Sequence, residues 1–135
     1  MQVLQPKGWK QPRGYVNGIS AEGRLVFVAG QVGWDETETF QSSDLADQIR
    51  QALRNTMAVL AEAGARAEHV ARMTWYITDK NEYLTNLRKI GEAYREVMGR
   101  HYPVMAMVQV AGLVEDGAKV EIESTAVIPP GSGTR

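Results

Sequence analysis

The chain has 135 residues, 44% of them hydrophobic, which suits a single domain with a substantial core. Its 15 basic and 16 acidic residues give a net charge of −1, which leaves no broad basic surface for nucleic acid or an anionic membrane. Because the chain has no cysteine, disulfides, thiolate metal sites and a cysteine nucleophile are excluded within it.

The first part of the chain predicts two strands followed by a helix. Residues 14–19 indicate a weak strand, joined by a short hairpin to the apolar run 25–29, which is typical of a strand covered on both faces. Asp44 predicts the start of the helix and Gly64 its end. One apolar stripe follows the helical spacing, and it consists of Leu45, Ile49, Leu53, Met57 and Leu60.

Polar side chains of this helix, Gln48 among them, are expected to lie away from the stripe. The alternation over residues 71–77 then predicts a half-buried strand. A second amphipathic helix is predicted over 82–98, with its apolar side chains inward; these are Leu84, Leu87, Ile90, Tyr94 and Val97. Two last strands, 104–111 and 119–127, are joined by a turn containing Glu115, Asp116 and Gly117.

The predicted order is therefore β-β-α-β-α-β-β. Two helices that each have one apolar stripe can bury both on one face of a mixed sheet, which gives a two-layer α+β sandwich. For a short chain, the simplest cover for the other face of the sheet is a second copy of the chain.

The pattern predicts one domain over residues 1–128 and a flexible tail over 129–135, where proline, glycine and small polar residues dominate. The sequence shows no apolar run of membrane-spanning length, and its first ten residues lack the apolar stretch of a signal peptide. We therefore expect a cytoplasmic protein that does not bind a membrane.

Several segments, taken in order, resemble the YjgF/RidA family, whose best-known members hydrolyse reactive imines and enamines. The similar segments are 25–31, 51–64, Thr78-Asp79, 101–103, 108–110 and 120–123. The resemblance implies a homotrimer of the chorismate-mutase-like kind, with clefts between neighbouring subunits that take a small-molecule ligand and no cofactor.

The resemblance also implies roles for individual residues. Glu121 aligns with the glutamate assigned to the attacking water, Tyr15 with an aromatic residue of the cleft, and Gly30 with a backbone site that polarises the substrate. Met105 stands where active members have an arginine that binds the substrate carboxylate. A thioether cannot replace the bidentate, charge-assisted bonds of a guanidinium, although Arg13, Arg24 or Arg100 could enter the cleft instead.

Each candidate also has a structural interpretation. Glu121 could lie on a solvated strand face, Tyr15 in the core, and Met105 could simply fill apolar space. Trp34 either closes the pocket or packs on the surface. His69 and His101 lack ligand spacing, so we predict structural roles for both and no metal site.

Three functions follow from these candidates. The first is hydrolytic deamination of imines or enamines, with reduced or altered activity on imino acids because of Met105. The second is a trimer that binds a metabolite without turnover. The third, a ribonuclease or an inhibitor of translation, comes only from labels given to members of the family that the chain resembles, and the acidic charge balance argues against it.

Overall fold

Four strands form the main sheet of the protein, which is described here by a computed structural model over residues 1–131. Their order across the sheet is β3 (Arg24–Val32), β6 (Val120–Ile128), β4 (Val70–Ile77) and β5 (Val104–Gln109). The β4–β5 pair is parallel and the other two pairs are antiparallel. Of the predicted flexible tail, 129–135, residues 132–135 lie outside the described residues.

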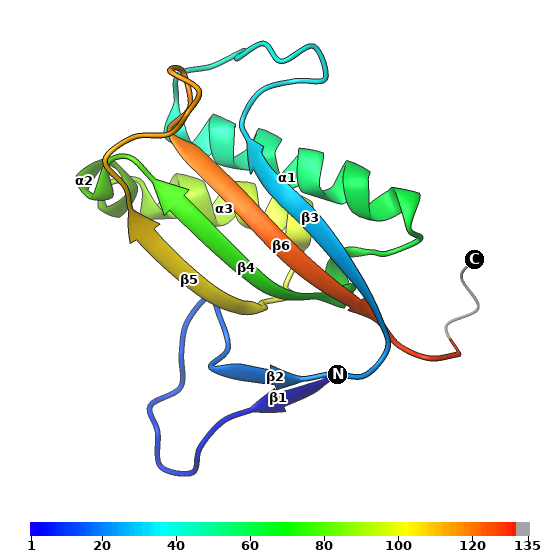
Figure 1. Ribbon diagram of the computed structural model, residues 1–135. Helices are drawn as coiled ribbons and strands as arrows, with labels where there is room; N and C mark the ends of the chain where they lie inside the picture. The colour runs from blue at the N-terminus through cyan, green and yellow to red at the C-terminus, as the bar shows by residue number, and fades with distance from the viewer. Residues whose placement is uncertain (132–135) are drawn as a thin grey trace.

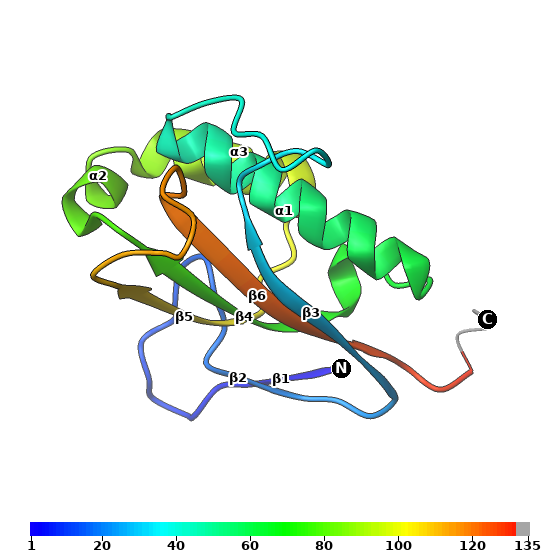
Figure 2. The ribbon, with the colours of Figure 1, turned by 45° about the horizontal axis from the view of Figure 1, so that its top comes forward.

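Two long helices cover one face of this sheet, and they leave the opposite face open (Figures 1 and 2). They are α1 (Leu45–Glu62) and α3 (Leu87–Met98); α2 (Lys80–Leu84) and a 3₁₀ turn at Ala67–His69 are short. Within residues 1–131, no helix is both long and apolar enough to cross a bilayer. The predicted two-layer α+β sandwich is confirmed.

The core lies between the two layers because each element turns its apolar side chains inward. On α1 the stripe of Leu45, Ile49, Leu53 and Leu60 is buried, and on β4 the buried set is Val70, Met73, Trp75 and Ile77. The Asp44 carboxylate accepts a hydrogen bond from the Asp47 backbone N–H at 3.0 Å, which caps α1 as predicted. Gly64 follows the helix with a φ of 75°.

Gln48 corrects the predicted polar face of α1, because its side chain is only 1% exposed. Its amide nitrogen donates to the carbonyls of Ser42 and Gly117, and its amide oxygen accepts from the Lys119 backbone N–H. The partners at 117 and 119 are distant in sequence, so helical spacing could not reveal them.

The predicted hairpin between residues 14–19 and 25–29 is wrong. Strand β2 (Gly18–Ser20) pairs instead with β1 (Gln2–Leu4), in a separate two-stranded sheet. Before it, Val16 bridges Val104 and its backbone N–H donates to the Pro103 carbonyl at 3.2 Å. The amino-terminal segment therefore passes along the β5 edge of the main sheet.

The predicted second helix is broken into α2 and α3. The Thr85 hydroxyl donates to the Asn81 carbonyl, and the Asn86 amide donates to the Glu82 carbonyl. Such local bonds offer the backbone an alternative to a continuous helix. Leu84 and Leu87, predicted to be inward, are about half exposed, at 53% and 50%.

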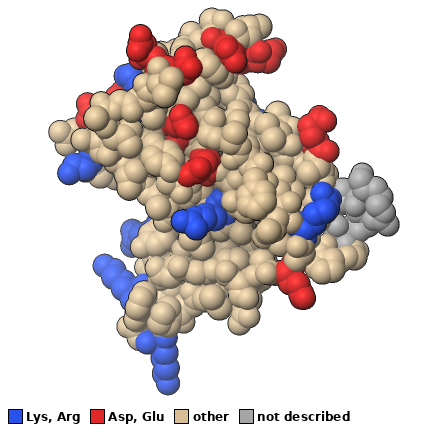
Figure 3. All heavy atoms as spheres, in the orientation of Figure 1, with Lys and Arg blue, Asp and Glu red and all other residues tan. Residues whose placement is uncertain are grey.

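The open face of the sheet carries large apolar side chains. Leu25 is 56% exposed and Phe27 is 71% exposed, so the prediction that β3 is covered on both faces is not met within one chain. Figure 3 looks onto this side of the molecule and shows a surface on which uncharged atoms predominate. A partner that covers this face would remove that apolar area from water.

Candidate functional site

The parallel register of β4 and β5 fixes where Met105 points. Met105 pairs with Met73, and Met107 pairs with Trp75. Neighbours in register share a face of the sheet, and Met73 and Trp75 are buried under the helices. Met105 and Met107 therefore also face the helical layer, where both are partly buried.

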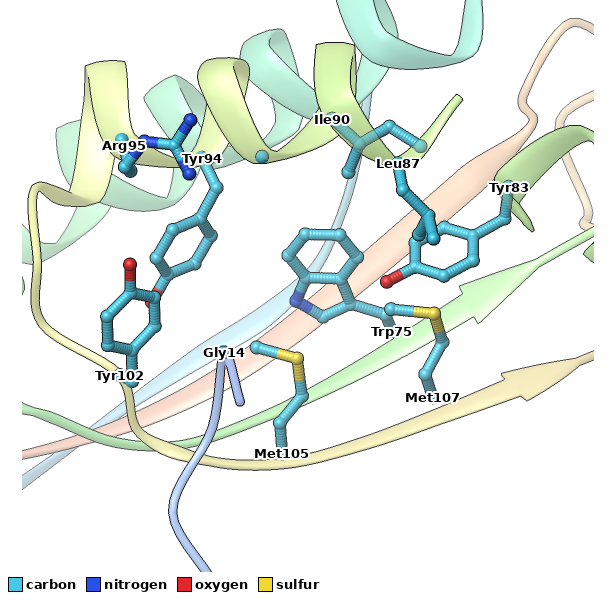
Figure 4. A pocket seen from close by; sticks show the side chains of 11 residues that line it. Gly14, Trp75, Tyr83, Leu87, Ile90, Tyr94, Arg95, Tyr102, Met105 and Met107 are labelled. Atoms are coloured by element: carbon cyan, nitrogen blue, oxygen red, sulfur yellow. The ribbon is translucent and has the colours of Figure 1, made fainter. Parts of the chain in front are cut away.

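A pocket of about 240 Å³ lies at this edge, between β5 and α3 (Figure 4). Its walls are mainly aromatic rings and methionine side chains. They include Trp75, Tyr94, Tyr102, Met105 and Met107, and Gly14 of the amino-terminal segment lies at the mouth.

Three aromatic rings form one side of the pocket. The Tyr94 and Tyr102 rings stack, with centroids 5.5 Å apart and planes 10° apart, and Trp75 lies 6.3 Å from Tyr94 at a tilt of 39°. The Tyr94 hydroxyl donates to the His101 carbonyl at 2.5 Å. Burial raises the pKa of both Tyr94 and Tyr83, so these phenols are neutral near pH 7.

The pocket also contains a polar group without a partner. Trp75 is only 2% exposed, and its indole Nε1–H has no hydrogen-bond partner among the described residues. Figure 4 shows the indole among the lining side chains, with its nitrogen on the ring edge toward Met105 and the stacked tyrosines. A ligand with an acceptor atom could satisfy this donor.

Gly30 and Glu121 form a second cluster, on the open face of the sheet. Glu121 is half-buried, and it alternates with Ile122, which is fully buried under the helices. A Cβ added at Gly30 would lie 2.1 Å from Glu121 Oε2 and 2.7 Å from its Cδ. Only glycine therefore allows this carboxylate to lie directly against the β3 backbone, where the β3–β6 register also shifts.

A phenol and a further carboxylate lie on the same face. Tyr76 is opposite Glu121 in the β4–β6 register, and its hydroxyl donates to Glu123 Oε1 at 2.5 Å. This hydrogen bond is the main reason why the pKa of Tyr76 is raised, with desolvation and the charges of Glu123 and Glu121 adding to it. The phenol therefore stays protonated as the donor to Glu123.

The predicted site residues thus fall into separate groups within one chain. Met105 lines the pocket under α3, whereas Tyr15 is 40% exposed and is not among the residues that line it, although the preceding residue, Gly14, is. Glu121 and Gly30 lie together on the opposite face of the sheet. Trp34 belongs to neither group: its ring packs against Phe40 at 5.6 Å, and its carbonyl accepts from the Asn55 amide at 2.7 Å.

The two histidines make local contacts to the backbone. His69 Nδ1 accepts from the Arg66 backbone N–H at 2.9 Å, and His101 Nε2 lies 2.6 Å from the Val70 carbonyl. Across residues 1–131, no three side chains of metal-ligating type come together. The structural roles of both histidines stay a prediction, which their contacts to the backbone are compatible with.

The sequence analysis assigned no site role to two of the pocket residues, Trp75 and Arg95. The alternation over residues 71–77 puts Trp75 on one face of its strand but indicates no role for it in a pocket. On α3, Gly91, Tyr94 and Arg95 are three and four residues apart, a spacing that puts them on one side of a helix. This spacing could have indicated that Arg95 lies beside Gly91 on the surface of the helix.

Comparison with known proteins connects this geometry to a family. A family model described as Endoribonuclease L-PSP matches residues 9–128. The 2-iminobutanoate/2-iminopropanoate deaminase of Salmonella typhimurium is 31% identical over 113 residues, which is 84% of this chain and 86% of that protein. The human protein of the same name is 31% identical over 108 residues, 79% of this chain and 75% of its own length.

Solved structures agree with the fold. The Rid family protein YyfB from Yersinia pestis, of unknown function, has a TM-score of 0.82 at 27% identity, covering 94% of this chain and 98% of its own. The structure of Escherichia coli TdcF with bound serine has a TM-score of 0.67 at 32% identity, covering 95% and 99%. With a family match over most of its length and these relatives, the chain belongs to the YjgF/RidA family, as its sequence pattern predicted.

Proposed function

We propose that the protein hydrolyses a small imine or enamine metabolite, releasing ammonia, at clefts between the subunits of a homotrimer. The observation that carries this proposal is the position of the Glu121 carboxylate directly against Gly30. Glu121 is half-buried and can act as a base, and the backbone of Gly30 beside it is exposed. Relatives of this chain named as 2-iminobutanoate/2-iminopropanoate deaminases support the reaction class.

A trimer would bring the pocket beside Met105 on one subunit close to the Gly30 and Glu121 cluster on its neighbour. Within one chain the sheet lies between Met105 and Glu121, so a cleft that uses both needs two copies. The exposed Leu25 and Phe27 on the open face support such an assembly, because burying them against a neighbour is favourable. In this arrangement one subunit supplies the pocket with Met105 and Tyr15, and its neighbour supplies Gly30 and Glu121.

The proposed chemistry needs a base and a positioned water. Glu121 takes a proton from a water molecule while the oxygen of that water adds to the C=N carbon. The electron pair of the double bond moves to the nitrogen, which gains a proton. The resulting carbinolamine loses ammonia as its hydroxyl becomes a carbonyl group. Tyr15 packs against the substrate and Gly30 contributes a backbone contact, whereas Trp34, which packs on Phe40, has no part in this chemistry.

Met105 is expected to change the preference among substrates. A hydrogen bond to a charged group contributes about 1.5–3 kcal/mol, or roughly ten- to hundredfold in rate when it acts in the transition state. Turnover of small imino acids should therefore lie far below that of an arginine-bearing relative, while neutral imines should be less affected.

The decisive experiment is ammonia release from neutral imines and enamines formed in solution, measured above their spontaneous hydrolysis. Glu121→Gln keeps the shape of the side chain and removes the base, so turnover should fall to background. Glu123→Gln is the matched control, because it changes a second carboxylate of the same strand face, one that is held by Tyr76. Full activity of Glu121→Gln would refute the mechanism.

A second candidate function is binding of a metabolite without turnover. The apolar, aromatic character of the pocket favours it, since such a surface can bind a ligand without any reacting group. Calorimetry separates the two functions: a ligand that binds the unmodified protein but releases no ammonia under any screened condition would support the binding module.

A further inference from the structure

The pocket beside Met105 contains a cation that the sequence did not indicate. Arg95 of α3 lines this pocket, and it is the one charged side chain among the described residues that do so. No carboxylate within residues 1–131 forms an ion pair with it. Its guanidinium is therefore available to an anionic ligand. Arg24, by contrast, donates to the Ala63 carbonyl at 3.1 Å.

The missing side chain of Gly91 leaves the space that the Arg95 guanidinium occupies. A Cβ added at Gly91 would lie 3.2 Å from Arg95 Nη1 and 3.8 Å from Nη2, so the arginine folds back along α3 over the bare glycine. One helical turn separates the two residues, and the fold-back carries the charge along the helical wall of the pocket (Figure 4). A larger residue at 91 would occupy the same space.

The rest of the pocket is suited to an apolar body. Met105 and Met107 form the wall that belongs to β5, and Trp75, Tyr94 and Tyr102 offer ring faces and edges. With a volume of about 240 Å³, the pocket has room for more than a two- or three-carbon chain. Aromatic rings and thioethers favour contact with an aromatic or bulky apolar group.

The buried indole N–H adds a third requirement. Trp75 Nε1 has no hydrogen-bond partner among the described residues, although Trp75 is only 2% exposed. A buried donor is normally satisfied, so the ligand is expected to bring an acceptor oxygen to this point. A carboxylate or a carbonyl group provides such an atom.

From these three features we infer that Arg95 binds the carboxylate of an acid whose side chain is aromatic or bulky and apolar. The inference rests on the proposed function and narrows it: the substrates would be imine or enamine derivatives of such acids, rather than of small amino acids. The guanidinium holds the carboxylate on the α3 wall, the apolar body contacts Met105 and Met107, and the indole of Trp75 donates to an oxygen of the ligand.

Phenylacetate and its uncharged isostere phenylacetamide test the inference directly, with acetate as the small acid. Calorimetry on the unmodified protein should show phenylacetate binding at least tenfold more tightly than phenylacetamide, and acetate more weakly than phenylacetate. Arg95→Gln should abolish the preference for the charged ligand, and Arg95→Lys should restore part of it. Arg88→Gln is the control, because Arg88 is on the same helix but pairs with Glu92 at 3.6 Å outside the pocket.

Gly91→Asn provides an independent variant. Asparagine is no worse than glycine as a helix former, so the protein should unfold at a similar or higher temperature. The new side chain should nevertheless displace the guanidinium and weaken phenylacetate binding severalfold, with little change for phenylacetamide. A purely structural role of Gly91 would not produce this selective loss.

The inference is overturned if phenylacetate does not bind, if both ligands bind equally, or if Arg95→Gln keeps the preference. These outcomes differ from a failure of the proposed function, because binding is measured without turnover. If neutral imines are hydrolysed but the protein does not bind phenylacetate more tightly than phenylacetamide, then only the role of Arg95 is wrong. If Arg95 discriminates the ligands but nothing is hydrolysed, then the deaminase proposal fails and the binding site remains.

Discussion

Replacing Gly30 by alanine gives a sharp test of the proposed base. The new Cβ would lie 2.1 Å from Glu121 Oε2, 2.7 Å from Cδ and 2.9 Å from Cγ. Ordinary carbon–oxygen contacts need well over 3 Å, so the carboxylate must move by about 1 Å or more. A misplacement of about 1 Å can reduce a rate by roughly a hundredfold, which is about 2.7 kcal/mol in the barrier. Because a partly exposed glutamate can swing away, the unfolding temperature should change little.

Ammonia release from a neutral imine, measured for Gly30→Ala, Glu121→Gln and the double variant, is the appropriate assay. If Gly30 acts through Glu121, the double variant should be no slower than Glu121→Gln alone. Gly112→Ala is a matched control, since a Cβ there would meet nothing within 4 Å. Wild-type turnover in Gly30→Ala, or fully additive losses in the double variant, would refute the reasoning.

Three further predictions concern stability and assembly. Gln48→Leu should lower the free energy of unfolding in urea by about 1–3 kcal/mol, because it leaves two part-buried carbonyls and one backbone N–H without their partner; Gln51→Leu, which loses only a bond to Asn55, should cost far less. Phe27→Asp, on the open face, should turn a trimer into monomers in size exclusion with light scattering, and an unchanged mass would contradict the proposed interface. Asp44→Ala should cost about 1 kcal/mol at pH 7 through the lost helix cap. The hydrogen bond from the Asp47 N–H lowers the pKa of Asp44 from its usual 3.8. The stabilisation is therefore fully present above pH 3.8 and is lost as the pH falls through the folded-state pKa. If the difference in unfolding free energy between wild type and Asp44→Ala is undiminished at about pH 2, this reasoning is contradicted.

Local signals predicted the elements that depend on local physics. The cap at Asp44, the stripe of α1 and the alternation of β4 each follow from neighbours in the chain, and all three are confirmed. Partners distant in sequence decided the remaining cases. Residues 18–20 do form a strand, but local pattern carries no information on its partner, which is Gln2–Leu4. The break at Thr85 and Asn86 depends on side-chain bonds that propensity alone does not weigh.

The candidate site was predictable only in part, because its geometry depends on strand order. Alternation indicates that Glu121 and Ile122 face opposite ways, but it does not show which face Met105 shares. The parallel pairing with β4 decides this, since Met105 stands beside Met73 on the helical side. A list of site residues from one sequence therefore could not reveal that Glu121 and Met105 lie on opposite faces of the sheet.

The opposite positions of Arg95 and Met105 lead to a last prediction. Arg95 comes from the α3 wall of the pocket and Met105 from the β5 wall (Figure 4). Met105→Arg should raise turnover of small imino acids by restoring a charge-assisted anchor, but in this chain it also places a second cation in a pocket with no lining carboxylate. Like charges in a partly desolvated space repel, so the gain should be larger in the double variant Met105→Arg with Arg95→Gln. Ammonia release from the imine of pyruvate, compared for the two variants, measures the difference. Equal rates would show that the charge of Arg95 does not repel an arginine at position 105. A faster single variant would show that Arg95 assists the new arginine instead of competing with it.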